Sequence, residues 1–229
     1  LILYFARGCL GMIPKIIHYC WFGGGDKPAL VKKCMGTWEK VLPGWDIIEW
    51  NEDNSPLSVP YVKNALEDKR YAFAADYVRF YALKTMGGVY LDTDVELIKD
   101  ISPLLNNKFF TAKESEELIN AAIMGSEKDG RFVNLVIQEL QLRTGHTYES
   151  IPKILTDIFN TVNGFKDETT IYDKEYFYPY NPFDNKRNEV KQLFYCDITP
   201  HTYAIHHWQQ SWHYTFLERV INRIRMLIK

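Results

Sequence analysis

The chain has 229 residues, of which 46% are hydrophobic and 24% charged, with a formal net charge of −2. This length and apolar content can bury a substantial core, so we expect a single domain. The small negative charge argues against nucleic-acid binding, and no apolar run approaches the roughly 20 residues of a membrane span. The four cysteines follow neither a metal-binding nor a disulfide-rich spacing, which indicates reduced thiols and a cytoplasmic protein.

The chain opens with eleven largely apolar residues, LILYFARGCLG, which are too few to span a bilayer. They precede Met12, which has the character of a natural first residue. We therefore expect residues 1–11 to be an upstream or artificial extension. A short first helix is the alternative, and a signal peptide is disfavoured because a basic leading region is missing.

The segment 13–22, IPKIIHYCWF, is rich in β-branched and aromatic residues and predicts the first core strand. An amphipathic helix is expected over 28–42 and a second strand over 45–50. Strand, helix and strand in this order predict a parallel βαβ unit. The glycines at 23–25 match no phosphate-loop pattern. Trp21 could stack on a nucleobase at the strand end, although a core or rim aromatic is the simpler interpretation of that residue alone.

The stretch 71–96, YAFAADYVRFYALKTMGGVYLDTDVE, joins an apolar helix to a short strand. Residues 73–86 lack Pro and Gly and are apolar on nearly every side, so this helix belongs in the interior. Asp76 and Arg79 lie three residues apart, which lets both side chains project from one edge of the helix. The double glycine at 87–88 is expected to end the helix before the strand begins.

Two aspartates, Asp92 and Asp94, follow the predicted buried strand over 89–91. Residues two apart lie on the same side of an extended chain, so both carboxylates are expected to face one cation. The site would lie at the carboxyl end of a strand, where open α/β sheets bind their ligands. A D-x-D pattern alone is weak evidence, because it arises by chance in many chains of this length.

The rest of the chain continues the α/β pattern. An extended segment is expected directly after the aspartates. Further predictions are helices over 60–70, 129–142 and 151–162, strands over 109–112 and 119–124, and a loop-rich region over 163–190.

Adjacent histidines, His206 and His207, lie in the segment 203–208, YAIHHW. Neighbouring residues on a strand point to opposite faces, so only one of the two is expected to enter a given site. A histidine considered alone is more often a satisfied polar group than a metal ligand.

Three segments, MIPKIIHYCWFGG, AADYVRFYALKTMGGVYLDTD and YAIHHWQQSW, together resemble the DXD-containing sugar transferases of glycosyltransferase family thirty-two. These are bacterial capsular and surface-polysaccharide enzymes, with more distant likeness to fungal initiating mannosyltransferases and to the glucosylating domains of large clostridial toxins. The resemblance covers most of the chain from Met12 to Trp212. It implies one GT-A-like α/β domain over 12–215, with a Rossmann-like, mostly parallel central sheet flanked by helices.

The resemblance implies a divalent cation, Mn²⁺ or Mg²⁺, held by Asp92 and Asp94. His206 would be the third protein ligand, with His207 as the alternative. Oxygen ligands suit both ions, and a nitrogen ligand favours Mn²⁺. Such an ion neutralises the negative charge that grows on a leaving diphosphate.

The donor implied by the resemblance is a nucleotide-diphosphate sugar, with a UDP-sugar favoured. Trp21 would stack on the base, and Asp76 would accept hydrogen bonds from sugar hydroxyls, with Arg79 beside the sugar and diphosphate. A buried Asp–Arg pair that only holds the helix in place is the structural alternative. The other donor contacts would be Tyr90, Asn120 and, in a loop that closes over the phosphates, Ser211 and Trp212.

The family is retaining, so the resemblance implies transfer to a polysaccharide, oligosaccharide or lipid-linked acceptor with the donor's anomeric configuration kept. We identify no carboxylate nucleophile, so double displacement and front-face attack both stay open. A metal-dependent nucleotidyl or phosphoryl enzyme would also use Asp92 and Asp94, but it gives no reason for Asp76 and Arg79. A non-catalytic sugar-binding module is the other alternative, and the D-x-D motif argues against it.

The final segment, 216–229, predicts a basic amphipathic helix. Such a helix lies either on an anionic membrane surface or against a protein partner, and the pattern supports both equally. The membrane interpretation implies a peripheral position at the inner face of the membrane, which suits a lipid-linked acceptor.

Overall fold

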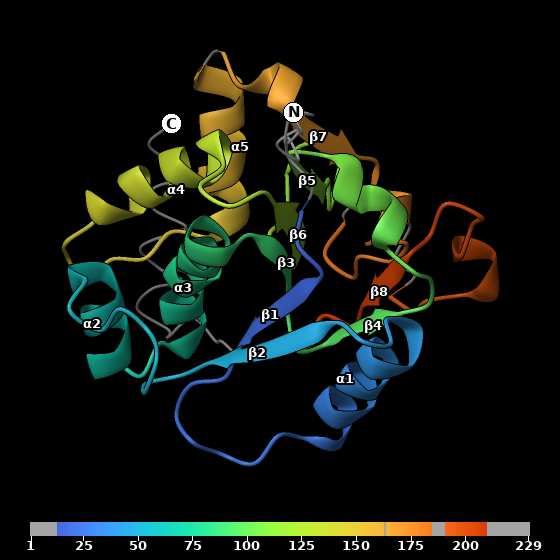
Figure 1. Cartoon of the computed structure of the whole chain (residues 1–229), viewed down its shortest axis with the longest axis horizontal. Helices are drawn as coiled ribbons and strands as arrows, with labels where there is room; N and C mark the ends of the chain where they lie inside the picture. Colours follow the sequence, from blue (N-terminus) through green and yellow to red (C-terminus); the bar gives the residue numbers. More distant parts are fainter. Residues whose placement is uncertain (1–12, 163, 185–190, 210–229) are drawn as a thin grey trace, which may run out of the picture.

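The computed structural model describes residues 13–162, 164–184 and 191–209. A central sheet organises them, with strand order β2-β1-β3-β6-β5-β7 (Figure 1). Strand β6 runs antiparallel to its neighbours β3 and β5, whereas the other pairings are parallel. The predicted mostly parallel α/β sheet is therefore confirmed. Its strands are β1 (Ile16–Cys20), β2 (Asp46–Trp50), β3 (Gly88–Leu91), β5 (Phe109–Ala112), β6 (Ile123–Ser126) and β7 (Thr169–Tyr172).

Helices cover both faces of this sheet (Figure 1). One face carries α2 (Pro60–Glu67), α3 (Tyr71–Met86), α4 (Arg131–Gln141) and α5 (Ile151–Thr161). The other face carries α1 (Ala29–Val41) and a two-stranded sheet of β4 (Val95–Leu97) and β8 (Ala204–His206). Short 3-10 helices occupy Ser102–Asn106, Lys166–Glu168, Lys174–Tyr176 and Tyr195–Asp197.

The βαβ unit forms as predicted. Strands β1 and β2 pair in parallel, with Tyr19 opposite Glu49 in the register. Helix α1 between them buries Trp38, whose indole Nε1 donates to the main-chain oxygen of Val95 at 2.8 Å. This bond ties the first helix to the strand that follows the two aspartates.

Helix α3 is buried on almost every side because it lies between the sheet and the neighbouring helices α2 and α4. Its apolar side chains join those of α4 and α5 in one core cluster, while α1 and β4 belong to a second cluster across the sheet. Successive strand residues alternate between these clusters: Val89 faces the α1 side and Tyr90 faces the α3 side. The sheet thus presents even-numbered residues of β3 to the helix that carries Asp76 and Arg79.

Two glycines make the sharp passage from α3 to β3. Gly87 has φ +69° and Gly88 has φ +112°, a region that side chains with a Cβ rarely adopt. A Cβ on Gly88 would also lie 2.7 Å from the main-chain oxygen of Ile16. The double glycine is therefore required both by backbone conformation and by the close approach of β1.

Two predicted elements need correction. The strand predicted over 119–124 is β6 at Ile123–Ser126. The residues before it form only an isolated bridge, Lys113 with Ile119, and the Asn120 side-chain oxygen accepts from the Ala122 amide, so the regular ladder begins at Ile123. The region 163–190, predicted to be loop-rich, contains β7, which pairs in parallel with β5 at the sheet edge.

Some predictions fall outside the described residues. These are the extension over 1–11, the loop with Ser211 and Trp212, and the helix over 216–229. Within the described ranges, no helix combines the length and the hydropathy needed to cross a membrane.

Candidate functional site

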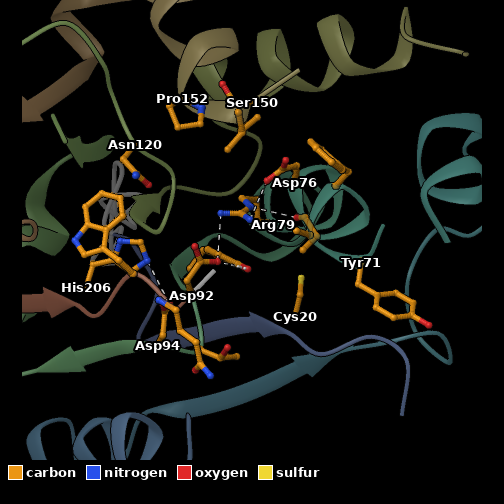
Figure 2. Close-up of a pocket in the computed structure, with 18 of the residues that line it drawn as sticks. Cys20, Tyr71, Asp76, Arg79, Asp92, Asp94, Asn120, Ser150, Pro152 and His206 are labelled. Carbon is orange, nitrogen blue, oxygen red and sulfur yellow. Dashed lines mark hydrogen bonds and ion pairs between the residues drawn. The ribbon is translucent and has the colours of Figure 1, made fainter. Parts of the chain in front are cut away.

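A cleft of about 760 Å³ opens at the carboxyl ends of β1 and β3. Residues from distant parts of the chain line it: the end of β1, helix α3, the turn after β3 and the segment after β8 (Figure 2). The start of α5 forms part of its rim. The sequence-predicted residues that line the cleft are Trp21, Asp76, Arg79, Tyr90, Asp92, Asp94, Asn120 and His206.

Asp92, Asp94 and His206 converge in this cleft. Each offers one ligand atom, and these atoms all lie within 4.8 Å of one another. The two aspartates meet by a different route from the one predicted, because β3 ends at Leu91 and residues 92–94 form a turn, closed by the Val95 amide donating to the Asp92 carbonyl at 3.0 Å. A turn, rather than the alternation of an extended chain, brings the two carboxylates together.

Strand pairing brings His206 to the aspartates. Strand β8 runs antiparallel to β4 with His206 opposite Val95, and the imidazole Nε2 lies 3.3 Å from Asp94 Oδ1. The ring is buried, and its Nδ1 has no hydrogen-bond partner among the described residues. Two carboxylates and an imidazole with an unpartnered buried nitrogen fit a divalent cation with oxygen and nitrogen ligands.

His207 turns away from this group. Its Nε2 lies 2.9 Å from Glu96 Oε2, on the opposite side of the two-stranded sheet from His206. The alternation expected of adjacent strand residues therefore holds, and the structure brings His206 rather than His207 to the aspartates.

Asp94 and His206 alter each other's protonation. Burial alone would raise the pKa of Asp94, but the charge of His206 and hydrogen bonds from His206 and the Gln209 amide hold that pKa below its ordinary value. Burial likewise favours a lower pKa for His206, yet the Asp94 carboxylate raises it. The pair therefore behaves as an ion pair when no ligand is bound.

Arg79 lies between the two acidic parts of the cleft. Its guanidinium contacts Asp76 Oδ1 at 2.9 Å and Asp92 Oδ1 at 3.3 Å. It also donates to the carbonyl oxygens of Ala75 and Ala121, at 3.2 and 3.0 Å. The side chain is buried and its planar group lies 4.7 Å from the centre of the Tyr90 ring. Arg79 is thus a fixed bridge between two carboxylates (Figure 2).

Tyr90 completes the support of the first aspartate. Its hydroxyl donates to Asp92 Oδ1 at 3.0 Å, the same oxygen that contacts Arg79. Among the described residues, both contacts of this carboxylate fall on Oδ1, so Oδ2 is the atom left to face a ligand. Tyr90 and Arg79 together fix the orientation of Asp92 in the absence of metal.

Asp76 is a buried carboxylate that faces the cleft. Burial raises its pKa to about 7, against the lowering effect of the Arg79 charge. A carboxyl group with this pKa exchanges a proton near neutrality and can both accept and donate hydrogen bonds to hydroxyl groups.

The other predicted donor residues differ in what holds them. Trp21 lies just beyond β1, with its indole Nε1 donating to the Gly25 carbonyl at 2.7 Å. Asn120 precedes β6 by three residues, and its side-chain oxygen accepts from the Ala122 amide at 2.7 Å. Its amide nitrogen donates to the carboxylate of Glu114.

Glu114, Trp208 and Gln209 also line the cleft and contact predicted site residues, although the sequence did not predict them for the site. Glu114 lies in a charged turn, yet it is half-buried, and burial raises its pKa against the opposing hydrogen bond from Asn120. Trp208 packs 4.3 Å from the His206 ring and has φ +56°, and the next amide, of Gln209, donates to Asp94 Oδ2 at 2.7 Å. Adjacency to the histidines was the available signal for Trp208 and Gln209, whereas nothing in the charged run distinguished Glu114.

Comparison with known proteins identifies the kind of site. Residues 28–111, which include Asp76, Arg79, Asp92 and Asp94, match the family described as the glycosyltransferase sugar-binding region containing a DXD motif. The named homologues of the chain are glycosyltransferases. The chain is therefore similar to glycosyltransferases over the part that carries these four residues.

The named relatives are distant. An uncharacterized glycosyltransferase of Acanthamoeba polyphaga mimivirus is 26% identical over 76% of this chain and 76% of its own length. Inositol phosphoceramide mannosyltransferase 3 of Schizosaccharomyces pombe is 26% identical over 56% of this chain and 37% of that protein. The chain thus spans only about a third of the yeast relative.

Among solved structures, the apo form of the glycosyltransferase GlyE of Streptococcus pneumoniae TIGR4 superposes with a TM-score of 0.54. The match covers 92% of this chain and 60% of GlyE at 14% sequence identity. At that identity the likeness concerns the fold, which is the GT-A-like arrangement that the sequence predicts.

Proposed function

We propose that this chain is a retaining glycosyltransferase that moves a sugar from a nucleotide-diphosphate sugar to a saccharide or lipid-linked acceptor. The observation that carries the proposal is the convergence of Asp92, Asp94 and His206 within 4.8 Å, beside the bridged pair Asp76 and Arg79. Carboxylates alone would suit many metal enzymes. A second acidic group tied to the first by one buried arginine supports a ligand with both a diphosphate and a hydroxyl-rich part.

The cation in this proposal is Mn²⁺ or Mg²⁺, held by Asp92, Asp94 and His206. When bound, such an ion neutralises charge on the diphosphate oxygens as the glycosidic bond breaks. The nitrogen ligand favours Mn²⁺. In its absence the Asp94–His206 ion pair holds the two ligands near each other, so the site is preformed.

The donor sugar is proposed to lie between Asp76 and Asn120, with Asp76 accepting hydrogen bonds from its hydroxyls. Arg79 acts in this scheme as a positioning residue, because its contacts go to two carboxylates and two carbonyl oxygens of the protein. Trp21 stacks on the nucleotide base, with uracil favoured. Ser211 and Trp212, outside the described residues, are proposed to close over the phosphates.

Front-face attack is the route that the site favours for retention. In it, the bond from the anomeric carbon to the diphosphate oxygen breaks as the bond to the acceptor oxygen forms, and the acceptor proton passes to the leaving diphosphate. Double displacement needs a carboxylate placed to attack the anomeric carbon. Among the described residues, the cleft has two carboxylates outside the metal set, Asp76 and Glu114. In this proposal Asp76 binds the sugar hydroxyls and Glu114 orients Asn120, so neither attacks the sugar.

The proposal also covers the acceptor and the location of the protein in the cell. The yeast relative is named for an inositol phosphoceramide, which supports a lipid-linked acceptor. We also propose a cytoplasmic location at the inner face of a membrane, with the basic amphipathic segment 216–229 as the part that binds the membrane surface. A role in bacterial capsular-polysaccharide synthesis rests on the resemblance alone.

The test compares donor turnover by the unaltered chain with turnover by a variant that lacks one aspartate of the motif. A thermal-shift screen of UDP- and GDP-sugars with Mn²⁺ first finds the donor that stabilises the chain. Release of nucleotide from that donor should then fall by about a hundredfold or more in Asp94→Ala, since the ligand set loses one carboxylate. Asp53→Ala, in an exposed turn, is the matched control.

Far-ultraviolet circular dichroism and the melting temperature check that the Asp94→Ala variant folds. Unchanged turnover in that folded variant would refute the proposed metal site. Turnover of nucleoside triphosphates without sugar would instead support the nucleotidyl or phosphoryl alternative.

A further inference from the structure

The chain that leaves β1 folds back over Trp21. The indole Nε1 donates to the Gly25 carbonyl at 2.7 Å, and the ammonium of Lys27 lies 5.3 Å from the centre of the indole ring. Trp21 lines the cleft, whereas Lys27 is not among the described residues that do so. One face of the indole is therefore backed by a cation while the ring borders the cleft.

Lys27 is itself held in place. Its ammonium lies 2.7 Å from Glu49 Oε2, and the Tyr19 hydroxyl donates to that same oxygen at 2.6 Å. The other oxygen of Glu49 accepts from the Asn51 amide at 3.2 Å. Because Glu49 and Tyr19 face each other across the paired strands β2 and β1, the ammonium rests on the rigid edge of the central sheet.

Lys27 also lies over a second ring, 5.6 Å from the centre of Tyr19. Attraction between a cation and the face of an aromatic ring fixes the distance between them. The hydrogen bond to Gly25 fixes the indole edge, so the ring is restrained at one face and one edge before any ligand arrives. A restrained ring loses less freedom when a base stacks on it, which strengthens binding without a new contact.

We infer that Lys27 is a positioning residue for nucleotide binding: held by Glu49, it keeps the Trp21 indole in the orientation in which a base stacks on it. The inference rests on the proposed function, in which Trp21 takes the base. It adds a residue that touches neither the diphosphate nor the sugar.

Isothermal titration of the full chain tests this inference with two probes in the same MgCl₂ buffer. One probe is UDP or GDP, whichever the unaltered chain binds more tightly. The other is inorganic pyrophosphate, which has no base. Lys27→Met keeps the aliphatic stem without the charge, Glu49→Gln removes its holder, and Lys27→Arg keeps a cation over the ring. Lys33→Met, on the exposed side of α1, is the control.

Lys27→Met and Glu49→Gln should each raise the Kd for the nucleotide by about threefold to tenfold, and leave the Kd for pyrophosphate within about twofold. Lys27→Arg and Lys33→Met should bind both probes as the unaltered chain does. Two results would overturn the inference and leave the proposed function standing. In one, folded Lys27→Met binds the nucleotide as tightly as the unaltered chain does. In the other, it loses affinity for pyrophosphate as much as for the nucleotide. If the unaltered chain binds pyrophosphate but neither nucleotide, the base site itself is wrong, and the proposed function falls with the inference.

Discussion

Arg79 shows how one residue can organise a site without needing to touch its ligand. Both carboxylates that it bridges belong to the cleft, one on its own helix and one in the turn after β3. Removing a buried partner of this kind leaves an uncompensated charge and costs about 3–5 kcal/mol. The interpretation as a structural Asp–Arg pair and the interpretation as a site residue are therefore compatible, because the pair that holds the helix also orients the acidic groups.

Substitution of Glu114 distinguishes the two proposed routes to retention, front-face attack and double displacement. Glu114→Gln keeps the size of the side chain and its capacity to accept a hydrogen bond from Asn120. If the acceptor attacks from the front face, we expect nucleotide release in the presence of acceptor to fall by less than about tenfold, because no covalent bond to Glu114 forms.

Steady-state rates measured with the donor found by thermal shift provide this comparison. A loss of a thousandfold or more, with unchanged melting temperature, would identify Glu114 as a nucleophile and contradict the front-face route. Glu116→Gln, at an exposed position of the same turn, controls for a general effect of replacing a carboxylate by an amide.

Among the connections between elements, the one from α3 to β3 requires two consecutive residues with positive φ. Helix, double glycine and strand must place Asp76 and Asp92 on the same side of the sheet, and Gly87 and Gly88 allow the chain to do so within two residues. The α3–β3 connection is thus part of the site, although no atom of either glycine needs to meet a ligand.

Gly88→Ala should lower the free energy of unfolding by about 3 kcal/mol, because the added Cβ meets the Ile16 oxygen in a backbone region that alanine disfavours. Gly36→Ala is the matched control: Gly36 lies at an exposed position of helix α1 with open space around it, and the substitution should stabilise the chain by about 0.5–1 kcal/mol. Urea unfolding at neutral pH measures both. Equal stability of the two variants would contradict this account of the α3–β3 connection.

His18 joins the same connection to the sheet and makes it sensitive to acid. Its Nε2 bonds to the Gly87 carbonyl at 2.8 Å, and the Trp50 indole donates to its Nδ1 at 3.2 Å, which requires a neutral ring protonated on Nε2. Burial lowers its pKa from the ordinary 6.5. Below pH 6.5 the unfolded chain then binds a proton that the folded chain resists, so stability falls as the pH drops.

In His18→Gln, the decline of unfolding free energy between pH 6.5 and 5.5 should be shallower than in the unaltered chain. The difference in slope is at most about 1.4 kcal/mol per pH unit, the value for one proton. Urea titrations at several pH values measure it, with the exposed His201→Gln as control. Parallel pH profiles of His18→Gln and the unaltered chain would contradict a neutral buried His18.

Elements with a strong periodic signal could be predicted from the sequence, and elements set by distant contacts could not. Helix α3 and strands β1 and β3 follow from their own apolar patterns. Strand β7 was missed because its residues, TTIY, are half-buried at a sheet edge and carry no apolar run. The start of β6 is set by contacts with residues distant in the sequence, such as the Tyr178 hydroxyl that accepts from the Ile123 amide at 3.2 Å.

The candidate site likewise has features that the sequence predicts and features that depend on distant contacts. Strand alternation was enough to expect that one of His206 and His207 enters it, and pairing with β4 selects His206. The bridging role of Arg79 could not be read, because its partners Asp92 and Ala121 become neighbours only in the folded chain. Glu114 was missed for the same reason.

At the scale of the whole molecule, membrane attachment is a prediction that concerns how the enzyme meets its acceptor. The basic amphipathic segment 216–229 suits an anionic surface. We expect the full chain to float with liposomes that contain anionic lipid, and a version ending at Thr215 to stay in the soluble fraction. Liposomes of neutral lipid serve as the control, and salt should weaken the binding. Equal flotation of both versions would contradict a membrane role for this segment.

The pairing of β4 with β8 has a consequence for how the molecule becomes active. Asp94 and the Gln209 amide that binds it are 115 residues apart in sequence, and His206 reaches the aspartates through the same short ribbon. Closing so long a loop is slow and entropically costly, so the ribbon is expected to form late in folding. A newly made chain would then complete most of its core before it gains the proposed metal site. A divalent cation bound there would favour the last step by joining the two ends of that loop. The temperature at which β8 detaches should consequently rise with metal concentration more steeply than the temperature at which α3 and its neighbours unfold.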